Sequence, residues 1–293
     1  MSTARTLTLA LGGKWHRDYG LACCPAHGDR KPSLTLADAT DGRLLLHCKT
    51  GCGFMDVLQA LRNRGLLNRQ PRPQPPDAAE LARRKAQNRA NAERAEHKAM
   101  ATWHEALPIG GTIAETYLRG RGITCALPDT LRFHPECWHP AAQRYPAMVA
   151  LIEGLPRVAI HRTYLRPDGS GKADAEPTKA MQGAASGGAV RLTEADGPLV
   201  VAEGIETALS LPSGLLRAPA TVWAALSTPG LAALRLPDHP HRLTIAADGD
   251  PAGLTAANKL AERADALGWT VSLLPAPQGR DWNDILMMKG ASA

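Results

Sequence analysis

Two short pairs of metal-ligand residue types lie near the start of the chain. The first pair is Cys24-Pro-Ala-His27, and the second pair, 20 residues further on, is Cys48-Lys-Thr-Gly-Cys52. Zinc prefers four soft or borderline ligands in a tetrahedron. Two ligand pairs on adjacent turns of a hairpin supply that geometry, and nearby glycines and prolines allow the backbone to wrap an ion. We therefore predict one zinc ion held by Cys24, His27, Cys48 and Cys52.

Other cysteines and histidines compete less well for this role. Cys23 and His47 adjoin the predicted ligands and are the alternatives, although Cys24 and Cys48 fit the flanking pattern better. Cys125 and Cys137 are interpreted as ordinary core or surface thiols. The N-terminus lacks a signal-peptide pattern, so we expect a cytoplasmic protein whose cysteines are ligands or thiols instead of disulfides.

Acidic residues follow apolar runs in the last third of the chain. Glu203 lies in VVAEGIETAL, Asp248 and Asp250 lie in IAADGDPAG, and Asp281 and Asp284 lie in GRDWNDIL. Carboxylates that cluster at strand ends repel each other unless a cation lies between them. Magnesium prefers oxygen ligands and keeps several waters, so a few carboxylates suffice to hold it. Such an ion can orient a nucleoside triphosphate and stabilise its charge.

The region from Gly197 onward alternates between strand and helix patterns. The apolar runs PLVVAEG, ATVWAAL, RLTIAADGD and TVSLLPA read as strands, and helical segments such as AGLTAANKLAERADALG separate them. This alternation predicts a parallel four-stranded, Rossmann-like sheet with right-handed crossovers. In such sheets functional groups collect at the carboxyl ends of the strands, which is where Glu203, Asp248 and Asp250 fall.

The front of the chain shows a different organisation. SLTL and RLLLHC, separated by ADATDG, predict a β-hairpin, and the spacing of Phe54, Val57, Leu58 and Leu61 predicts a short helix. RQPRPQPPD predicts a linker, and the Ala-, Arg- and Glu-rich residues 77–106 predict a solvated helix. The fold class is therefore α/β, with predicted domains at 1–67 (zinc ribbon), 68–106 (linker and charged helix), 107–196 (α+β) and 197–293.

Charge is distributed unevenly along the chain. Residues 1–106 carry a net charge of +7 and residues 107–293 a net charge of −1, within a total of +6. A basic front region favours a polyanionic partner such as nucleic acid, and a basic surface without a partner is the alternative. No stretch approaches the roughly 18 apolar residues of a membrane span, so we expect no membrane partner.

Basic and aromatic residues also precede the last domain. The segment HRTYLRPDGSGK, which includes Arg162 and Lys172, is expected to form a basic hairpin, and Lys179 with the loop GAASGG could hold a phosphate. Trp103, Trp138 and Trp282 are candidates for base stacking, with core packing as the alternative for each.

The N-terminal segment resembles the Cys-His-Cys-Cys zinc ribbon of bacterial and phage primases. The residues that carry the resemblance are Cys24-Pro25-Ala26-His27, Lys31-Pro32-Ser33-Leu34, Cys48 to Cys52, and Asp56-Val57-Leu58. Three residues separate the last two cysteines, where the cellular pattern has two. In this respect the segment looks more like phage and mobile-element relatives.

The acidic motifs, each placed after an apolar strand and before a helix, resemble those of the Toprim fold, which primases, topoisomerases and some nucleases share. The resemblance implies that Glu203 is a general acid/base and that Asp248 and Asp250 are magnesium or manganese ligands. It further implies that Asp281 or Asp284 supplies a third contact. In relatives the preceding region holds template and nucleotide, which here implies Arg162, Lys172 and Lys179. Glu206, one helical turn beyond Glu203, is interpreted as a secondary polar contact or a solvated residue.

Together these resemblances predict a DNA primase that makes short RNA primers on single-stranded DNA from ribonucleoside triphosphates. The alternatives are a Toprim-type metal-dependent nuclease and a non-catalytic single-strand-binding replication or mobilisation adaptor. A topoisomerase is disfavoured, because no partner domain with the required tyrosine can be placed among only four tyrosines. No P-loop pattern is present, so we expect a separate replicative helicase as a partner.

Overall fold

The computed structural model describes residues 3–39, 43–67 and 78–291, with only the backbone for residues 78–81. By its internal contacts the chain divides into two compact units, Met1–Arg83 and Arg84–Ala293. None of the helices in the described part of the chain is long and apolar enough to cross a membrane. The predicted proline-rich linker RQPRPQPPD lies outside the described residues.

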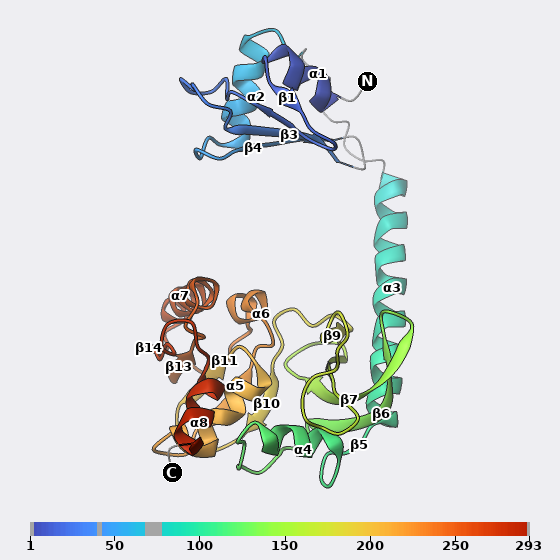
Figure 1. The fold of residues 1–293 in the computed structure, drawn as a ribbon, viewed down its shortest axis with the longest axis vertical. Coiled ribbons are helices and arrows are strands. Elements are labelled where there is room, and N and C mark those ends of the chain that lie inside the picture. The colour runs from blue at the N-terminus through green and yellow to red at the C-terminus, as the bar shows by residue number, and fades with distance from the viewer. Residues whose placement is uncertain (1–2, 40–42, 68–77, 292–293) are drawn as a thin grey trace. The chain divides into compact units, whose positions relative to one another are not determined.

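The N-terminal unit contains an antiparallel sheet in the order β1-β2-β3-β4 (Figure 1). Its elements are α1 (Thr3–Ala10), β1 (Lys14–Trp15), β2 (Gly20–Ala22), β3 (Leu34–Asp38), β4 (Leu44–Cys48) and α2 (Phe54–Asn63). The predicted hairpin is confirmed as β3 and β4, and the predicted helix as α2, whose Val57 and Leu61 are buried. Helix α1 had no counterpart among the predictions.

The C-terminal unit contains two sheets, of which the first is antiparallel in the order β5-β6-β7-β8-β9. Its elements are β5 (Leu107–Pro108), α4 (Ile113–Gly120), β6 (Leu131–His139), β7 (Gln143–Ile152), β8 (Ala159–Tyr164) and β9 (Lys179–Gln182). The predicted helix at 77–106 is confirmed as α3 (Ala78–Glu105). Near the end of α3, Ala99 packs with Val149 and Ile160 against one face of this sheet.

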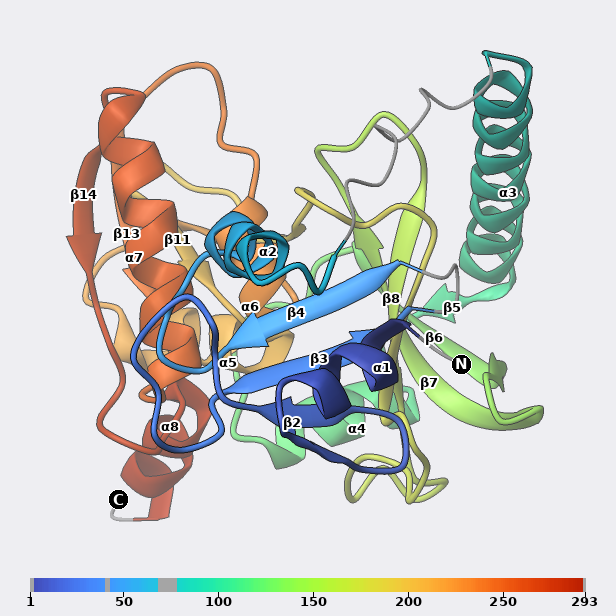
Figure 2. The ribbon, with the colours of Figure 1, turned by 90° about the horizontal axis from the view of Figure 1, so that it is seen from above.

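The second sheet has the order β10-β12-β11-β13-β14. Its elements are β10 (Val190–Thr193), β11 (Leu199–Ala202), α5 (Ile205–Ser210), η1 (Leu211–Leu215), β12 (Thr221–Ala224), α6 (Thr228–Ala233), β13 (Arg242–Ala246), α7 (Pro251–Ala266), β14 (Thr270–Leu273) and α8 (Trp282–Ala291). The four predicted strands pair in parallel, and β10 adds an antiparallel edge strand. Helices α6 and α7 cover one face and α5 and α8 the other (Figures 1 and 2).

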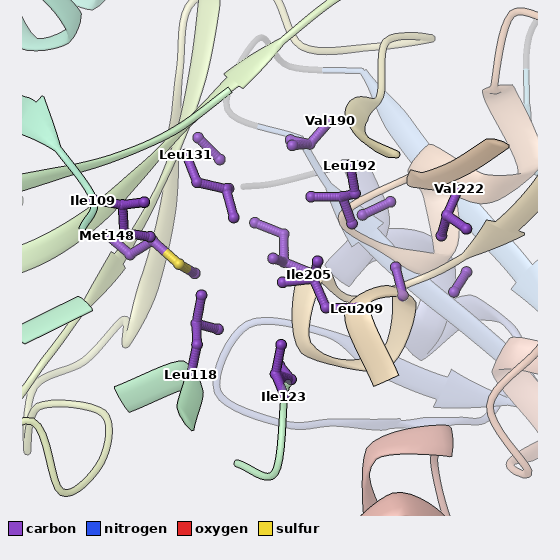
Figure 3. Close-up of a cluster of buried hydrophobic side chains, with 14 of the residues drawn as sticks. Ile109, Leu118, Ile123, Leu131, Met148, Val190, Leu192, Ile205, Leu209 and Val222 are labelled. Atoms are coloured by element: carbon purple, nitrogen blue, oxygen red, sulfur yellow. The ribbon is translucent and has the colours of Figure 1, made fainter. Parts of the chain in front are cut away.

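A single apolar core joins the two sheets of the C-terminal unit. Leu118 from α4 and Met148 from β7 pack with Leu192 from β10 and with Ile205 and Leu209 from α5 (Figure 3). Each such buried side chain contributes roughly 1.5–3 kcal/mol of hydrophobic stabilisation. The shared core fixes side chains on the first sheet relative to those on the second, so the two sheets can build one site.

Candidate metal and nucleotide sites

The four predicted zinc ligands converge in the N-terminal unit. The Sγ atoms of Cys24, Cys48 and Cys52 and a ring nitrogen of His27 all lie within 4.8 Å of one another. His27 Nδ1 is 3.1 Å from Cys52 Sγ and 4.0 Å from Cys48 Sγ. A tetrahedral ion with bonds of about 2.3 Å to sulfur and 2.0–2.1 Å to nitrogen suits ligands at such separations. Cys23 and His47 do not belong to this group.

Local backbone geometry explains how the three-residue spacing between the last two cysteines is accommodated. Strand β4 ends at Cys48, and Gly51 follows with a φ of 95°. This left-handed conformation suits glycine, which has no Cβ. The Gly51 N–H donates to the Cys48 carbonyl at 3.1 Å. The tight turn brings Cys52 back beside Cys48.

Polar neighbours orient the ligands. Asp29 Oδ2 accepts hydrogen bonds from the Cys24 N–H at 2.9 Å and from Ser33 Oγ at 2.5 Å, and it lies 3.7 Å from His27 Nε2. Thr50 Oγ1 is 3.1 Å from the same ring nitrogen. Metal-bound histidines commonly use their second nitrogen to contact a carboxylate or another acceptor. The contacts at Nε2 therefore leave Nδ1 as the ligand atom of His27.

The thiols influence one another strongly. Burial, together with a hydrogen bond and charge from Cys48, raises the pKa of Cys24 to about 11. Burial also acts to raise the pKa of Cys48, but hydrogen bonds from Thr50 and from the backbone of Cys52 outweigh it and lower that pKa to about 5. All three cysteines can ionise together only with a cation between them. The donor set fits zinc.

The predicted acids lie at the carboxyl edge of the second sheet. Glu203 directly follows β11, and Asp248 follows β13 by one residue. These strands are parallel neighbours, with Ala202 opposite Ala246, so both carboxylates reach the same edge. Together with Asp281, which directly precedes α8, they line a pocket of about 110 Å³.

The acids in this pocket, and Asp250 beside its lining, destabilise one another's charged forms. Burial, then the charges of Glu203, Asp281 and Asp250, raise the pKa of Asp248 to about 7. Burial and Asp250 also raise the pKa of Glu203. Asp248 Oδ1 is buried without a hydrogen-bond partner. A divalent cation would stabilise the ionised carboxylates and would give Asp248 Oδ1 a partner. Carboxylate oxygens are the donors that magnesium prefers.

The acidic group is more open than the zinc cluster. Within the described residues, the Cys-His-Cys-Cys group is the only set of three or more His, Cys, Asp or Glu side chains that lie close enough together to hold a metal ion as they stand. The carboxylates fit a magnesium ion that keeps several waters or substrate oxygens. They do not form a closed protein cage.

Three of the predicted acids also have roles at helix starts. Asp250 is the N-cap of α7, where its Oδ1 accepts from the Gly253 N–H at 2.6 Å. Its second oxygen leaves it able to act as a ligand. Asp281 and Asp284 form a reciprocal cap before α8: Asp281 Oδ1 accepts from the Asp284 N–H, and Asp284 Oδ2 accepts from the Asp281 N–H. Of these two, only Asp281 lines the pocket.

Three cations face the acids across the same pocket. Lys172, from the segment after β8, and Lys179, from β9, line it together with Arg121, which follows α4. The structure thus brings the predicted Lys172 and Lys179 together with Glu203 and Asp248. Arg121 is one of several basic residues that precede the Toprim domain, and no pattern in the sequence distinguishes it from the others.

Glu206 holds the two lysines. It is 4% exposed, accepts from Tyr117 Oη at 2.7 Å, and lies 3.2 Å from Lys172 Nζ and 3.5 Å from Lys179 Nζ. Burial acts to raise the pKa of Glu206, but Lys179, Lys172 and the Tyr117 hydroxyl outweigh it and lower the pKa. Glu206 is therefore a buried polar contact, and the alternative of a solvated residue is wrong.

Arg162 lies apart from the pocket lining. It is buried on β8, donates to the Trp138 carbonyl at 2.7 Å, and lies over the Tyr164 ring at 5.7 Å. Successive residues of a strand point to opposite faces, so Arg162 and its neighbour His161 face opposite ways. His161, on the other face, is close enough to Lys179 and Glu206 for their charges to affect its pKa.

The backbone around the acids is tightly constrained. A Cβ on Gly249 would lie 2.0 Å from the Pro277 carbonyl oxygen, so only glycine lets the loop between Asp248 and Asp250 pack on the segment before α8. Leu226, which also lines the pocket, has a φ of 73°, and its N–H donates to the Glu203 carbonyl at 2.7 Å. Unusual backbone conformations of this kind occur most often at functional sites.

Comparison with protein-family models assigns the two halves of the C-terminal unit. Residues 198–292 match the Toprim domain. The C-terminal region is a Toprim domain. Residues 93–192 match a domain of unknown function (DUF7146). The pocket thus combines acids of the Toprim domain with Lys172 and Lys179 of the preceding domain.

Solved structures give a weaker comparison. The zinc-binding and RNA polymerase domains of the Aquifex aeolicus primase align over 100% of this chain and 81% of that chain, with 15% identity and a TM-score of 0.43. A DNA primase domain from Pseudomonas aeruginosa aligns over 67% of this chain and 75% of that chain, with 18% identity and a TM-score of 0.40. No curated protein matches the chain significantly.

Proposed function

We propose that this chain is a DNA primase that makes short RNA primers on single-stranded DNA. The observation that carries the proposal is the pocket in which Glu203 and Asp248 of the Toprim domain face Lys172, Lys179 and Arg121. Carboxylates that can hold a divalent cation, placed opposite three cations, suit the polyphosphate of a nucleoside triphosphate. The Cys-His-Cys-Cys group in the same chain favours priming over other Toprim activities.

The cations have the task of binding phosphate. Lys172 and Lys179 present compact ammonium groups, and Glu206 keeps both in place while they still reach the pocket. Arg121 Nε is buried without a hydrogen-bond partner, so the guanidinium retains donors for a further oxygen. These three groups would bind and orient the triphosphate of the incoming ribonucleotide.

The acids have two tasks. Magnesium or manganese, held by Asp248 and Asp250 with Asp281 near by, would supply charge neutralisation at the phosphates. Glu203 has a raised pKa and accepts from Thr228 Oγ1 at 3.3 Å. A carboxylate with a raised pKa is a stronger base, so Glu203 would accept the proton of the attacking primer hydroxyl.

The N-terminal unit would engage the template. Its positive charge favours single-stranded DNA, and phosphate contacts release counterions, so template binding should weaken steeply with added salt. Deletion of residues 1–67 should reduce template binding while the Toprim domain stays folded. Equal binding by the truncated and full chains would assign the zinc unit another role.

The decisive experiment measures incorporation of labelled ribonucleotides on single-stranded DNA, with magnesium, with manganese, and without either. Short labelled products that require a divalent metal are expected. Cleavage of the template without nucleotides, lost on Asp248→Ala, would instead show a nuclease. Binding without either reaction would indicate a single-strand-binding adaptor. Because we also propose a separate helicase partner, the assay is repeated with the replicative helicase of the host or element.

A further inference from the structure

Asn283 is a fully buried polar residue that has no part in the proposed chemistry. It is the second residue of α8, has an exposed fraction of 0%, and closely follows Asp281, which lines the pocket. Its Nδ2 donates to the Arg121 carbonyl at 2.8 Å and to Ser210 Oγ at 2.9 Å. A buried amide costs free energy unless it is hydrogen-bonded, so these two contacts account for an amide at this position.

Both partners of Asn283 need a donor. The Arg121 carbonyl can only accept. Ser210 Oγ uses its one hydrogen to donate to the Glu206 carbonyl at 2.8 Å, so it too accepts from Asn283. Asn283 Oδ1 has no hydrogen-bond partner among the described residues. The hydrogen bonds of the side chain are therefore made by its NH2 group, which neither an aspartate nor a leucine could replace.

The two hydrogen bonds join elements that carry groups of the pocket. Arg121 follows α4 and lines the pocket, and Ser210 lies on α5 one turn after Glu206, which holds the two lysines. Arg121 lies within the match to DUF7146, whereas Asn283 and Ser210 lie in the Toprim domain. Asn283 therefore ties a cation of one domain to helices of the other that begin beside the pocket acids.

Other contacts hold the loop that begins at Arg121. Gly122 has a φ of 74°, and a Cβ there would lie 3.1 Å from Met287 Sδ on α8. The Thr124 N–H donates to Ser213 Oγ at 3.1 Å. These contacts would keep the loop docked on the Toprim domain if the buried amide were removed. The amide has a narrower effect, because its hydrogen bond sets the direction of the Arg121 peptide group.

The Arg121 side chain starts from this peptide group and reaches the pocket. Its Nε is buried without a hydrogen-bond partner, so no protein contact at that atom orients the guanidinium. Lys172 and Lys179 are instead oriented through their charged ends, by Glu206. A hydrogen bond to the backbone of Arg121 is therefore a means by which the Toprim domain can direct this cation.

We propose that Asn283 is a positioning residue, which holds the Arg121 guanidinium where it can bind a phosphate beside the Toprim acids. The inference rests on the proposed function, because it takes the pocket as the binding site of a nucleoside triphosphate. Asn283 touches neither the nucleotide nor the metal, and it acts through the backbone of Arg121.

The test is a double-mutant cycle of Asn283→Leu and Arg121→Ala in the full chain, with the binding of ATP in excess magnesium measured by calorimetry. Arg121→Ala is expected to weaken ATP binding by about 10- to 150-fold, the range for a hydrogen bond to a charged group. Asn283→Leu should weaken it by about 3- to 10-fold, because the guanidinium is displaced but not lost. The double variant should bind ATP as Arg121→Ala does, since the side chain that Asn283 positions is already absent.

Stability separates positioning from a merely structural role. Arg121→Ala keeps the carbonyl that accepts from Asn283, so Asn283→Leu should lower the free energy of unfolding equally with and without the Arg121 side chain. ATP affinity that falls further on Asn283→Leu in the Arg121→Ala background would overturn the proposal, as would unchanged affinity in Asn283→Leu alone. If Asn283→Leu does not fold, Asn283→Ala, which adds no bulk beside the two oxygens, takes its place. Failure of both to fold would assign Asn283 to the fold and overturn the proposal.

Two controls come from α7. Asn258→Leu changes an exposed asparagine of the same domain and should leave ATP affinity unchanged. Leu260→Ala removes a fully buried side chain from the opposite face of the sheet, so it should lower the free energy of unfolding yet leave ATP affinity unchanged. A loss of ATP affinity in Leu260→Ala as large as in Asn283→Leu would show that general destabilisation explains both, and would overturn the proposal.

The binding cycle and the incorporation assay separate this proposal from the proposed function. If the parent binds ATP and the cycle shows the expected coupling, but no ribonucleotide is incorporated, the positioning role stands and the primase proposal is rejected. Primer synthesis combined with an additive cycle would do the reverse. If the parent chain binds no ATP, the positioning role is wrong and the incorporation assay alone decides the function.

Discussion

The zinc cluster and the Toprim pocket are two ways of building a site for a cation. The zinc cluster takes all its ligands from one hairpin and its flanks, between Cys24 and Cys52, and its donors are thiols and one imidazole. The pocket collects groups from Arg121 to Asp281, and it contains cations as well as acids. Glu206 already neutralises two lysines there. We therefore expect the N-terminal unit to depend on its metal for folding, whereas the charges of the pocket are partly neutralised by its own residues.

Loss of the zinc ligands should have the largest effect on the structure. Cys24→Ser and Cys52→Ser should lose the ion and unfold the N-terminal unit, because zinc binding contributes about 10–16 kcal/mol in small zinc modules. The Toprim domain should stay folded. Metal content and amide hydrogen exchange measure the two outcomes. Cys125→Ser, which alters a thiol far from the cluster in sequence, is the control, and full zinc retention in both ligand variants would refute the assignment.

Removal of the proposed metal-binding and catalytic acids should abolish activity without loss of the fold. Asp248→Ala and Asp250→Ala are expected to eliminate primer synthesis, because both remove proposed metal ligands. Asp250→Ala should also lower the free energy of unfolding by about 1 kcal/mol, because it removes the cap of α7. Glu203→Ala should be inactive but bind metal better than the aspartate variants do. Asp265→Ala, at an exposed position on α7, should remain active, and activity in Asp248→Ala would exclude the proposed site.

Replacement of Glu206 tests whether its negative charge neutralises and positions the two lysines of the pocket. Glu206→Gln should raise the KM for ribonucleotides more than it lowers kcat, because both lysines lose the group that positions them. The free energy of unfolding should fall by roughly 2–3 kcal/mol, which is less than for a fully buried pair because the lysines reach solvent. Tyr117→Phe removes one hydrogen bond to the same carboxylate and should cost about 1–2 kcal/mol. Unchanged KM in Glu206→Gln would remove its positioning role.

His161 should give an effect that appears only at acid pH, a loss of stability. Burial, then the positive charge of Lys179, lower the pKa of His161 to about 4 from its usual 6.5. The folded state therefore resists protonation of His161. The free energy of unfolding keeps its full value above pH 6.5 and falls by about 3 kcal/mol in total as the pH drops towards 4. In melting curves, His161→Phe should flatten this part of the pH dependence. His241→Phe, at an exposed position, should not. If the melting temperatures of the parent and His161→Phe depended on pH in the same way, the lowered pKa of His161 would be contradicted.

Local patterns in the sequence were sufficient for much of the fold. The hairpin of β3 and β4, helix α2 and the four parallel Toprim strands follow from periodicity and turn residues, because these elements are determined by neighbours in the chain. Helix α1 and strand β6 were not predicted. The apolar periodicity of α1 is short, and β6 carries Pro135 at a register irregularity, which masks its alternation.

The Cys-His-Cys-Cys group could be predicted from sequence, because its members lie close in the chain, on either side of the hairpin of β3 and β4, and their spacing largely sets their geometry. The pocket could be predicted only in part. Glu203 and Asp248 follow apolar strands, so their position at the sheet edge was foreseeable. The roles of Arg121 and Glu206 and the separation of Arg162 from the pocket depend on which faces of two sheets meet. Only the tertiary structure decides this, because side chains distant in sequence come together through the shared core around Met148 and Ile205.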